Sequence, residues 1–176
     1  ELILGTYGAD TARLFMMSDS PPERDLEWTE SGVEGAWRYI NRLWRLLDEP
    51  PVQFGDGATP DTYGEAATAL RRTMHKAVHG VTEDLEKFHF NRAVARIREA
   101  TNALADAKGD GPDMAAAYRE GLEAVIRLIS PITPHIAEEM WTQLGHAELI
   151  ADAPWPVADP ALIVDDMITM PIQING

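Results

Sequence analysis

Apolar residues in this chain recur every three to four positions over long stretches, and Pro or Gly interrupts each stretch. The clearest stretch is residues 31–48, where Ser31 and Glu34 have the spacing of a helix-capping box. Its apolar side chains share one side of a helix, as expected for about 3.6 residues per turn. They are Val33, Ala36, Trp37, Ile40, Leu43, Trp44 and Leu47. The spacing predicts an amphipathic helix that buries this side and ends before Pro50-Pro51.

The same periodicity predicts further helices. A short helix over 11–17 follows the capping residue Asp10, and Thr59-Pro60 predicts the start of a long helix that ends near Glu86. Gly80 weakens that helix by about 1 kcal/mol relative to alanine. Three more are predicted over 91–104, 113–129 and 133–144. Short links favour antiparallel neighbours, so we expect an all-α antiparallel bundle of four to five main helices over residues 9–145.

The two ends of the chain lack the long helical periodicity of the middle. Residues 1–8 are interpreted as the end of a linker from a preceding domain, and residues 146–176 as an extended C-terminal tail. Within the tail, apolar residues alternate over 168–174, a pattern typical of a β-strand. A single strand needs a partner, which we expect either outside this chain or in residues 161–166. Neither end looks like a natural terminus, so we expect the chain to be a piece of a longer protein.

Five tryptophans are divided between helices and loops. Trp37, Trp44 and Trp141 lie on apolar stripes and are predicted to be core residues. Trp28 and Trp155 lie in loops, where we expect them to pack against protein.

Charge and composition restrict the classes of function. The chain has 176 residues, no cysteine and a net charge of −14, which argues against a general binder of polyanions. The absence of cysteine excludes disulfides and thiolate metal sites and fits a cytoplasmic protein. No apolar run approaches the roughly 18–20 residues that span a bilayer, so no membrane partner is expected. Residues 38–98 nevertheless hold 10 of the 15 Lys and Arg residues, which leaves room for a local nucleic-acid face.

Three predicted helices each carry basic residues along one face, called here a basic line. The first has Arg38, Asn41, Arg42 and Arg45; the second Arg72 and Lys76; the third Arg92 and Arg96. Arginine pairs with phosphates in a bidentate manner, and asparagine can read a base edge. From the residues alone, a groove for folded RNA and ordinary solvated helix faces remain equally acceptable interpretations.

No catalytic constellation is evident. His75 and His79 have a spacing that can hold a metal, but no third ligand is marked, so no metal site is expected. Glu86 and His89 have di-iron spacing only once, and His135 with Glu138 and Glu139 fits the first turns of a helix. No Gly-rich phosphate loop occurs. We therefore predict no catalytic residues and no cofactor in this chain.

The amino-acid sequences of several segments resemble those of bacterial leucyl-tRNA synthetases, which are class I aminoacyl-tRNA synthetases. The resemblance covers nearly the whole chain in the right order, and Ser20-Pro-Pro-Glu-Arg-Asp-Leu-Glu-Trp28 is its most specific segment. The others are Tyr7-Gly-Ala-Asp-Thr-Ala-Arg-Leu-Phe15, Ser31-Gly-Val-Glu-Gly35, Asn41-Arg-Leu-Trp-Arg-Leu46, Val81-Thr-Glu-Asp84, Phe90-Asn91, Ser130-Pro-Ile-Thr-Pro-His-Ile-Ala-Glu-Glu-Met-Trp141, Ala153-Pro-Trp-Pro156 and Pro171-Ile-Gln-Ile-Asn-Gly176.

The resemblance implies the helical anticodon-binding domain of a leucine–tRNA ligase. Such a domain would hold tRNA(Leu) and contact the catalytic and C-terminal domains of the same enzyme. ATP and Mg²⁺ would serve the parent enzyme only, because the signatures His-Ile-Gly-His and Lys-Met-Ser-Lys-Ser are absent here. The resemblance carries Asn41 and Arg45 over as a pair that contacts base or backbone.

Two other interpretations of function stay open at this level. The chain could be a helical protein-interaction module that packs on other synthetase domains or on an acidic partner, without direct RNA contact. An independent metal-dependent hydrolase would rest on His75 and His79 alone.

Overall fold

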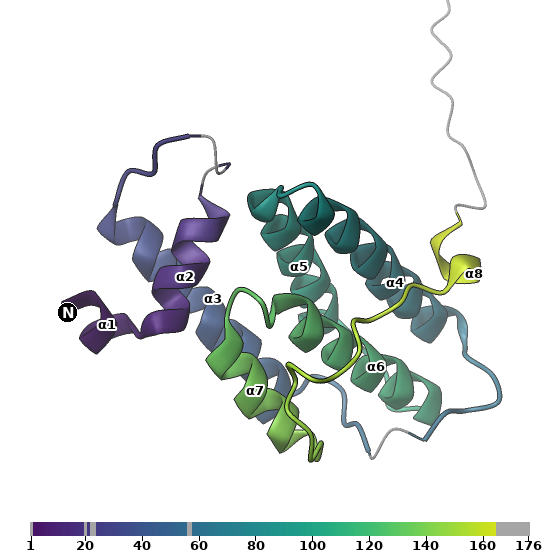
Figure 1. Ribbon diagram of the computed structural model, residues 1–176. Helices are drawn as coiled ribbons and strands as arrows, with labels where there is room; N and C mark the ends of the chain where they lie inside the picture. The colour runs from purple at the N-terminus through teal and green to yellow at the C-terminus, as the bar shows by residue number, and fades with distance from the viewer. Residues whose placement is uncertain (1, 20, 22–23, 56–57, 165–176) are drawn as a thin grey trace, which may run out of the picture.

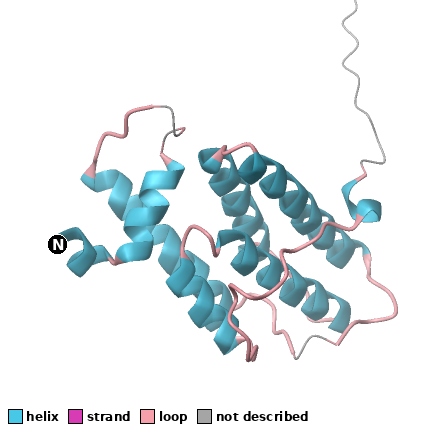
Figure 2. Ribbon diagram, viewed as in Figure 1, coloured by secondary structure: helices cyan, strands magenta, loops and turns pink. Residues whose placement is uncertain are grey.

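The described part of the chain, residues 2–19, 21, 24–55 and 58–164 of a computed structural model, contains helices and loops and no strand (Figures 1 and 2). This confirms the all-α prediction. The eight helices are α1 (Leu2–Tyr7), α2 (Ala9–Ser18), α3 (Glu30–Asp48), α4 (Glu65–Glu86), α5 (Phe90–Ala105), α6 (Pro112–Ile129), α7 (Pro134–Gln143) and α8 (Pro160–Ile163).

The helices form two adjoining groups. The long helices α4, α5 and α6 pack against one another, and α3 packs against α2 and α7 and touches α5 (Figure 1). Residues 145–164, called here the C-terminal strap, run across α6 and α4 and end in α8 (Figure 1). Helix α3 and helix α4 therefore belong to different groups.

Several predicted helix ends are confirmed and others are wrong. Pro134 opens α7, as expected for proline in the first turn, and α6 begins at Pro112, one residue before its predicted start. Helix α3 is capped by Thr29 and not by Ser31: the Thr29 hydroxyl accepts from the Gly32 N–H at 3.3 Å. A Cβ on Gly32 would collide with Phe15, so the close packing of α2 on α3 fixes this start.

Helix α4 begins at Glu65, five residues later than Pro60 suggested. Gly64 is extended, and its N–H donates to the Asp113 carboxylate at 2.9 Å. This contact with α6 keeps the residues between Pro60 and Gly64 out of a helical conformation. Gly80 does not interrupt α4, which is continuous to Glu86.

The core of α3 is rotated relative to the prediction. Trp37 is 45 % exposed and is not a core residue, whereas Tyr39 and Leu46 are buried. The Tyr39 hydroxyl hydrogen-bonds the Thr101 hydroxyl at 2.8 Å, and burial raises the pKa of Tyr39 to about 12. A tyrosine whose hydroxyl finds a partner can be buried as readily as an aliphatic side chain.

The other tryptophans follow the prediction more closely. Trp141 is buried and Trp44 packs, half-buried, against the core. Trp28 meets the Phe15 ring edge-on, and Trp155 donates to the Thr82 hydroxyl at 2.9 Å.

Both ends contain short helices, although the C-terminal tail was expected to be extended. Residues 2–7 form α1, and the tail contains α8, where Asp159 caps the helix through the Ala161 N–H. The strand predicted over 168–174 lies outside the described residues.

Candidate nucleic-acid interface

The outer face of α3 carries the first predicted basic line. Arg38, Arg42 and Arg45 are exposed, and Arg38 makes only a surface ion pair with Glu34 at 3.5 Å. Asn41 donates from Nδ2 to the Trp37 carbonyl at 2.8 Å. Among the described residues, the side chains of Arg42 and Arg45 make no hydrogen bond or ion pair. The rigid helix thus presents cationic groups that the fold itself does not use.

The two arginines of α5 have a different role. The buried carboxylate of Asp84 accepts from Arg96 Nε at 2.7 Å, and Arg92 Nε lies 3.3 Å from the same carboxylate. A Cβ on Gly80 would lie 2.9 Å from atoms of the Arg96 side chain, so glycine makes room for that side chain across α4. Arg92 and Arg96 therefore tie α5 to α4.

The basic residues do not gather in one groove. Lys76 and Arg96 line a groove of about 220 Å³ between α4 and α5, together with Thr73 and Glu99. Arg72 donates to the Val164 carbonyl at 3.1 Å, beside α8. The lining of the groove between α4 and α5 includes none of the basic residues of α3.

A second hollow adjoins the basic face of α3. It has a volume of about 450 Å³ and is lined by α3 residues Trp37, Ile40 and Asn41, by Asp10 of α2 and by His135 of α7. The His135 Nδ1 lies 2.8 Å from one oxygen of Asp10, and the other oxygen accepts from the Ile136 N–H at 2.8 Å. Sequence reasoning missed Asp10 as a partner of α7, because no local spacing joins residues 125 positions apart.

The cluster of His135, Glu138 and Glu139 is divided among separate structural partners. His135 binds Asp10, both oxygens of Glu138 accept from the Ile150 N–H, and Glu139 accepts from Gln143. The side chains do not converge on one point, in agreement with the structural role expected for them.

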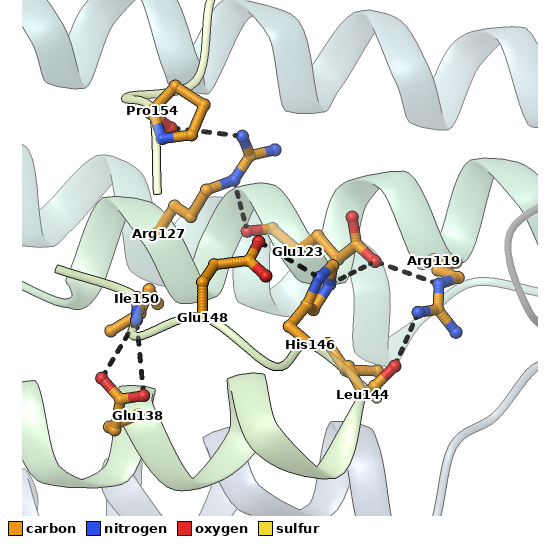
Figure 3. Close-up of polar contacts among 9 residues, drawn as sticks. All are labelled: Arg119, Glu123, Arg127, Glu138, Leu144, His146, Glu148, Ile150 and Pro154. Atoms are coloured by element: carbon orange, nitrogen blue, oxygen red, sulfur yellow. Dashed lines mark hydrogen bonds and ion pairs between the residues drawn. The ribbon is translucent and has the colours of Figure 1, made fainter. Parts of the chain in front are cut away.

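A polar cavity of about 490 Å³ lies beside α6. Arg119 binds the Glu123 carboxylate and the Leu144 carbonyl, while Arg127 donates to the Pro154 carbonyl (Figure 3). Arg119 also donates to the Gly55 carbonyl. His146 bonds Glu123 at 3.1 Å (Figure 3). Its ring also stacks on Trp141. These charged groups bind the C-terminal strap and the loop after α3 to α6, so their hydrogen bonds are made within the chain.

The two histidines considered for a metal have different surroundings. The Nδ1 of His75 accepts from the Asp159 N–H at 2.9 Å, so its Nε2 carries the proton that is donated to Glu120 at 3.0 Å. Both nitrogens are engaged, whereas His79 is exposed. Within the described residues, no group of three His, Asp or Glu side chains is arranged as a set of metal ligands.

Glu120 joins α6 to α4 and gives the fold an acid-sensitive contact. Although burial opposes its ionisation, hydrogen bonds from His75 and from Arg71 at 2.6 Å lower its pKa to about 2. This folded-state pKa lies below the ordinary value of 4.5. Ionised Glu120 therefore stabilises the fold above pH 4.5, and this stabilisation is lost as the pH falls toward 2.

We expect Glu120→Gln to lower the free energy of unfolding at neutral pH by about 1–2 kcal/mol, a figure discounted because a third of the side chain is exposed to solvent. Urea denaturation of both proteins across the acid range measures this difference, which should shrink below pH 4.5. Glu99→Gln, on an exposed position of α5, is the matched control. A difference that stays constant with pH would contradict the assigned role.

Comparison with known proteins places the chain in a class. The family described as the anticodon-binding domain of tRNA ligase matches residues 67–176, and the chain belongs to this family. Its relatives are more specific. The chain is 55 % identical to the leucine–tRNA ligase of Rhodospirillum rubrum and 56 % identical to that of Paramagnetospirillum magneticum, in each case with 99 % of the chain covered.

A solved structure gives the same result. The chain superposes with a TM-score of 0.83 and 30 % identity on LeuRS of Agrobacterium radiobacter, crystallised in a ternary complex with tRNA and LeuAMS. The match covers 99 % of this chain and 23 % of that one. The chain spans about one fifth of the length of these two curated relatives, which is 20 % for each. In the described part of the chain, no helix is both long and apolar enough to cross a membrane.

Proposed function

We propose that this chain is the tRNA-docking helical domain of a leucine–tRNA ligase. It would hold tRNA(Leu) in the cytoplasm while a separate catalytic domain attaches leucine in an ATP- and Mg²⁺-dependent reaction. The chain would contribute no catalytic residue and no cofactor site. Its similarity to leucine–tRNA ligases over 99 % of its length supports this assignment.

The observation that carries the proposal is the outer face of α3. Arg42 and Arg45 extend from a helix whose opposite face is buried, and no acidic side chain of the described residues pairs with them. A chain with a net charge of −14 gains nothing for solubility from two unpaired arginines on one face. Phosphate oxygens are the partners that such guanidinium groups bind best.

The remaining basic residues are proposed as secondary contacts. Lys76 and Arg96 share the groove between α4 and α5, and Arg72 and Arg92 lie on the same two helices. Because Asp84 already binds Arg92 and Arg96, their contribution to RNA affinity should be smaller than that of the α3 residues.

We expect the double variant Arg42→Ala/Arg45→Ala to raise the KM for tRNA roughly 30-fold in the ligase that carries this segment. This corresponds to the loss of about 1 kcal/mol for each of the two contacts, the typical net contribution of one hydrogen bond. The slope of log affinity against log salt should fall by about 2, since two phosphate contacts are removed. Steady-state aminoacylation and salt-dependent binding measure the two effects.

The controls separate RNA docking from catalysis and from net charge. Leucine-dependent pyrophosphate exchange, which needs no tRNA, should stay nearly unchanged. Lys87→Ala/Lys108→Ala removes the same charge from exposed positions outside α3 and should leave the KM for tRNA nearly unchanged. Unchanged tRNA kinetics in the arginine variant would instead favour a helical module that packs on other protein domains.

A further inference from the structure

One arginine of α5 is left without a counter-charge. The buried carboxylate of Asp84 binds Arg92 and Arg96. Arg98, in contrast, lies on the side of α5 that faces α3, and its Nε–H is buried without a hydrogen-bond partner. Within the described part of the chain, its guanidinium group makes no hydrogen bond and no ion pair. The fold therefore holds a half-buried cation that it does not neutralise.

Tyr39 of α3 fixes the position of this cation. The guanidinium carbon of Arg98 lies over the Tyr39 ring, 5.0 Å from its centre. The ring is itself held in place, because it is buried and its hydroxyl bonds the Thr101 hydroxyl at 2.8 Å. A guanidinium group held over an aromatic face keeps the N–H groups at its edge available to donate. Arg98 is thus already ordered for an anion.

A second unpaired arginine lies on the other helix of the same junction. Burial raises the pKa of Tyr39 to about 12, although its hydrogen bond with Thr101 opposes the rise. The positive charges of Arg98 and Arg42 also act to lower this pKa, so both guanidinium groups act on the same hydroxyl, one from α5 and one from α3. Arg42 is exposed and, like Arg98, forms no ion pair with the described residues. Two uncompensated charges therefore flank Tyr39 where α3 touches α5.

The two helices themselves offer these arginines no local acidic partner. Neither Arg42 nor Arg98 has an Asp or Glu three or four positions away, the spacing at which helical side chains pair. Glu99, next to Arg98, lines the groove between α4 and α5 instead. Like charges repel, so an anion placed between the two guanidinium groups would stabilise the junction. A phosphodiester suits this place, since it is permanently charged and its oxygens accept readily from arginine.

We propose that Arg42 and Arg98 clamp one phosphate of the docked tRNA across the junction of α3 and α5. Arg42 binds it from the exposed face of α3, and Arg98 binds it from the inner side, where Tyr39 holds its guanidinium group. Contacts along a single helix leave the RNA free to turn about that helix, whereas a contact from a second helix fixes its orientation. This inference rests on the proposed function, because it needs tRNA on α3.

Arg98→Gln in the ligase that carries this segment tests the clamp. We expect tRNA binding to weaken roughly 5- to 10-fold, because one contact to a phosphate is lost. The slope of log affinity against log salt should fall by about 1. Ethylation of single tRNA phosphates should identify one phosphate whose modification weakens binding to the wild-type protein and has no further effect on Arg98→Gln. Lys108→Ala, which removes one exposed charge elsewhere, should leave affinity and slope nearly unchanged.

Further variants separate phosphate binding from support of the fold. Arg98→Lys keeps the charge but not the planar fork, so it should keep the salt slope and only part of the affinity. Arg98→Gln should unfold at nearly the same urea concentration as the wild type, since the fold loses no hydrogen bond or ion pair among its described residues. Arg98→Gln combined with Arg42→Ala should weaken binding by less than the product of the two single effects, because both side chains bind one phosphate.

The outcomes distinguish this clamp from the proposed function. If Arg42→Ala/Arg45→Ala weakens binding and Arg98→Gln does not, the basic face of α3 binds tRNA and the clamp is wrong. The clamp is also wrong if Arg98→Gln weakens binding without a change of salt slope, or if its effect multiplies fully with that of Arg42→Ala. If none of these variants affects tRNA, the proposed function itself fails, and an acidic protein would be the partner of the unpaired arginines.

Discussion

Leu43→Ala should lower the free energy of unfolding by about 3–4 kcal/mol, the usual cost of an Ala at a fully buried Leu position. Leu43 has no exposed surface and lies on the inner face of α3. The substitution removes apolar contacts and leaves a cavity that neighbouring helices cannot fill completely. Urea denaturation of the purified chain, followed by circular dichroism, measures the change.

Trp37→Ala is the matched control on the same helix. Trp37 is the larger side chain, but it is 45 % exposed, so its loss should cost no more than about 1 kcal/mol. The two variants together test which face of α3 is buried. An equal loss of stability in both would mean that Trp37 belongs to the core after all.

Asp84→Ala should have the second-largest effect, a loss of about 2–3 kcal/mol of unfolding free energy. The carboxylate is buried and lies within 2.7 Å of Arg96 Nε and 3.3 Å of Arg92 Nε. Breaking a buried pair typically costs about 3–5 kcal/mol because one charge stays unpaired. The expected value is smaller here, since both arginine side chains are partly exposed and can turn toward water.

Glu83→Ala provides the comparison for Asp84. Glu83 precedes Asp84 on α4 and makes only an exposed ion pair with Lys87 at 3.9 Å. Its replacement should change the stability by less than about 0.5 kcal/mol. The variant pair Asp84→Ala and Arg96→Ala, measured singly and together, gives the coupling between the two residues. A coupling near zero would contradict the role assigned to this contact.

The sequence predicts the fold class well because its signals are local. Helical periodicity, together with Pro112 and Pro134 at helix starts, is sufficient for the all-α class and for the order of the long helices. The errors in the predicted helix starts arise where residues distant in the sequence contact the start of a helix. Phe15 packs on Gly32 beside the Thr29 cap of α3, and Asp113 holds Gly64 just before the start of α4.

The candidate site was only partly predictable for the same reason. An arginine stripe on α3 is visible in the spacing of Arg38, Arg42 and Arg45. Nothing in the spacing shows that Asp84 binds Arg92 and Arg96, or that Asp10 meets His135 across 125 positions. The apolar stripe of α3 predicts Trp37 as a core residue and does not include Tyr39, whose buried hydroxyl finds a partner only when Thr101 lies beside it.

The missing side chain at Gly80 also determines how α4 and α5 are aligned along their axes. Arg96 crosses α4 over Gly80 and reaches Asp84, one helical turn further on. If the two helices slid by one turn, about 5.4 Å, a larger residue would lie beneath Arg96 and its carboxylate partner would be out of place. Apolar contacts alone would tolerate such a slip far better. One glycine and one ion pair thus select a single register for α4 and α5.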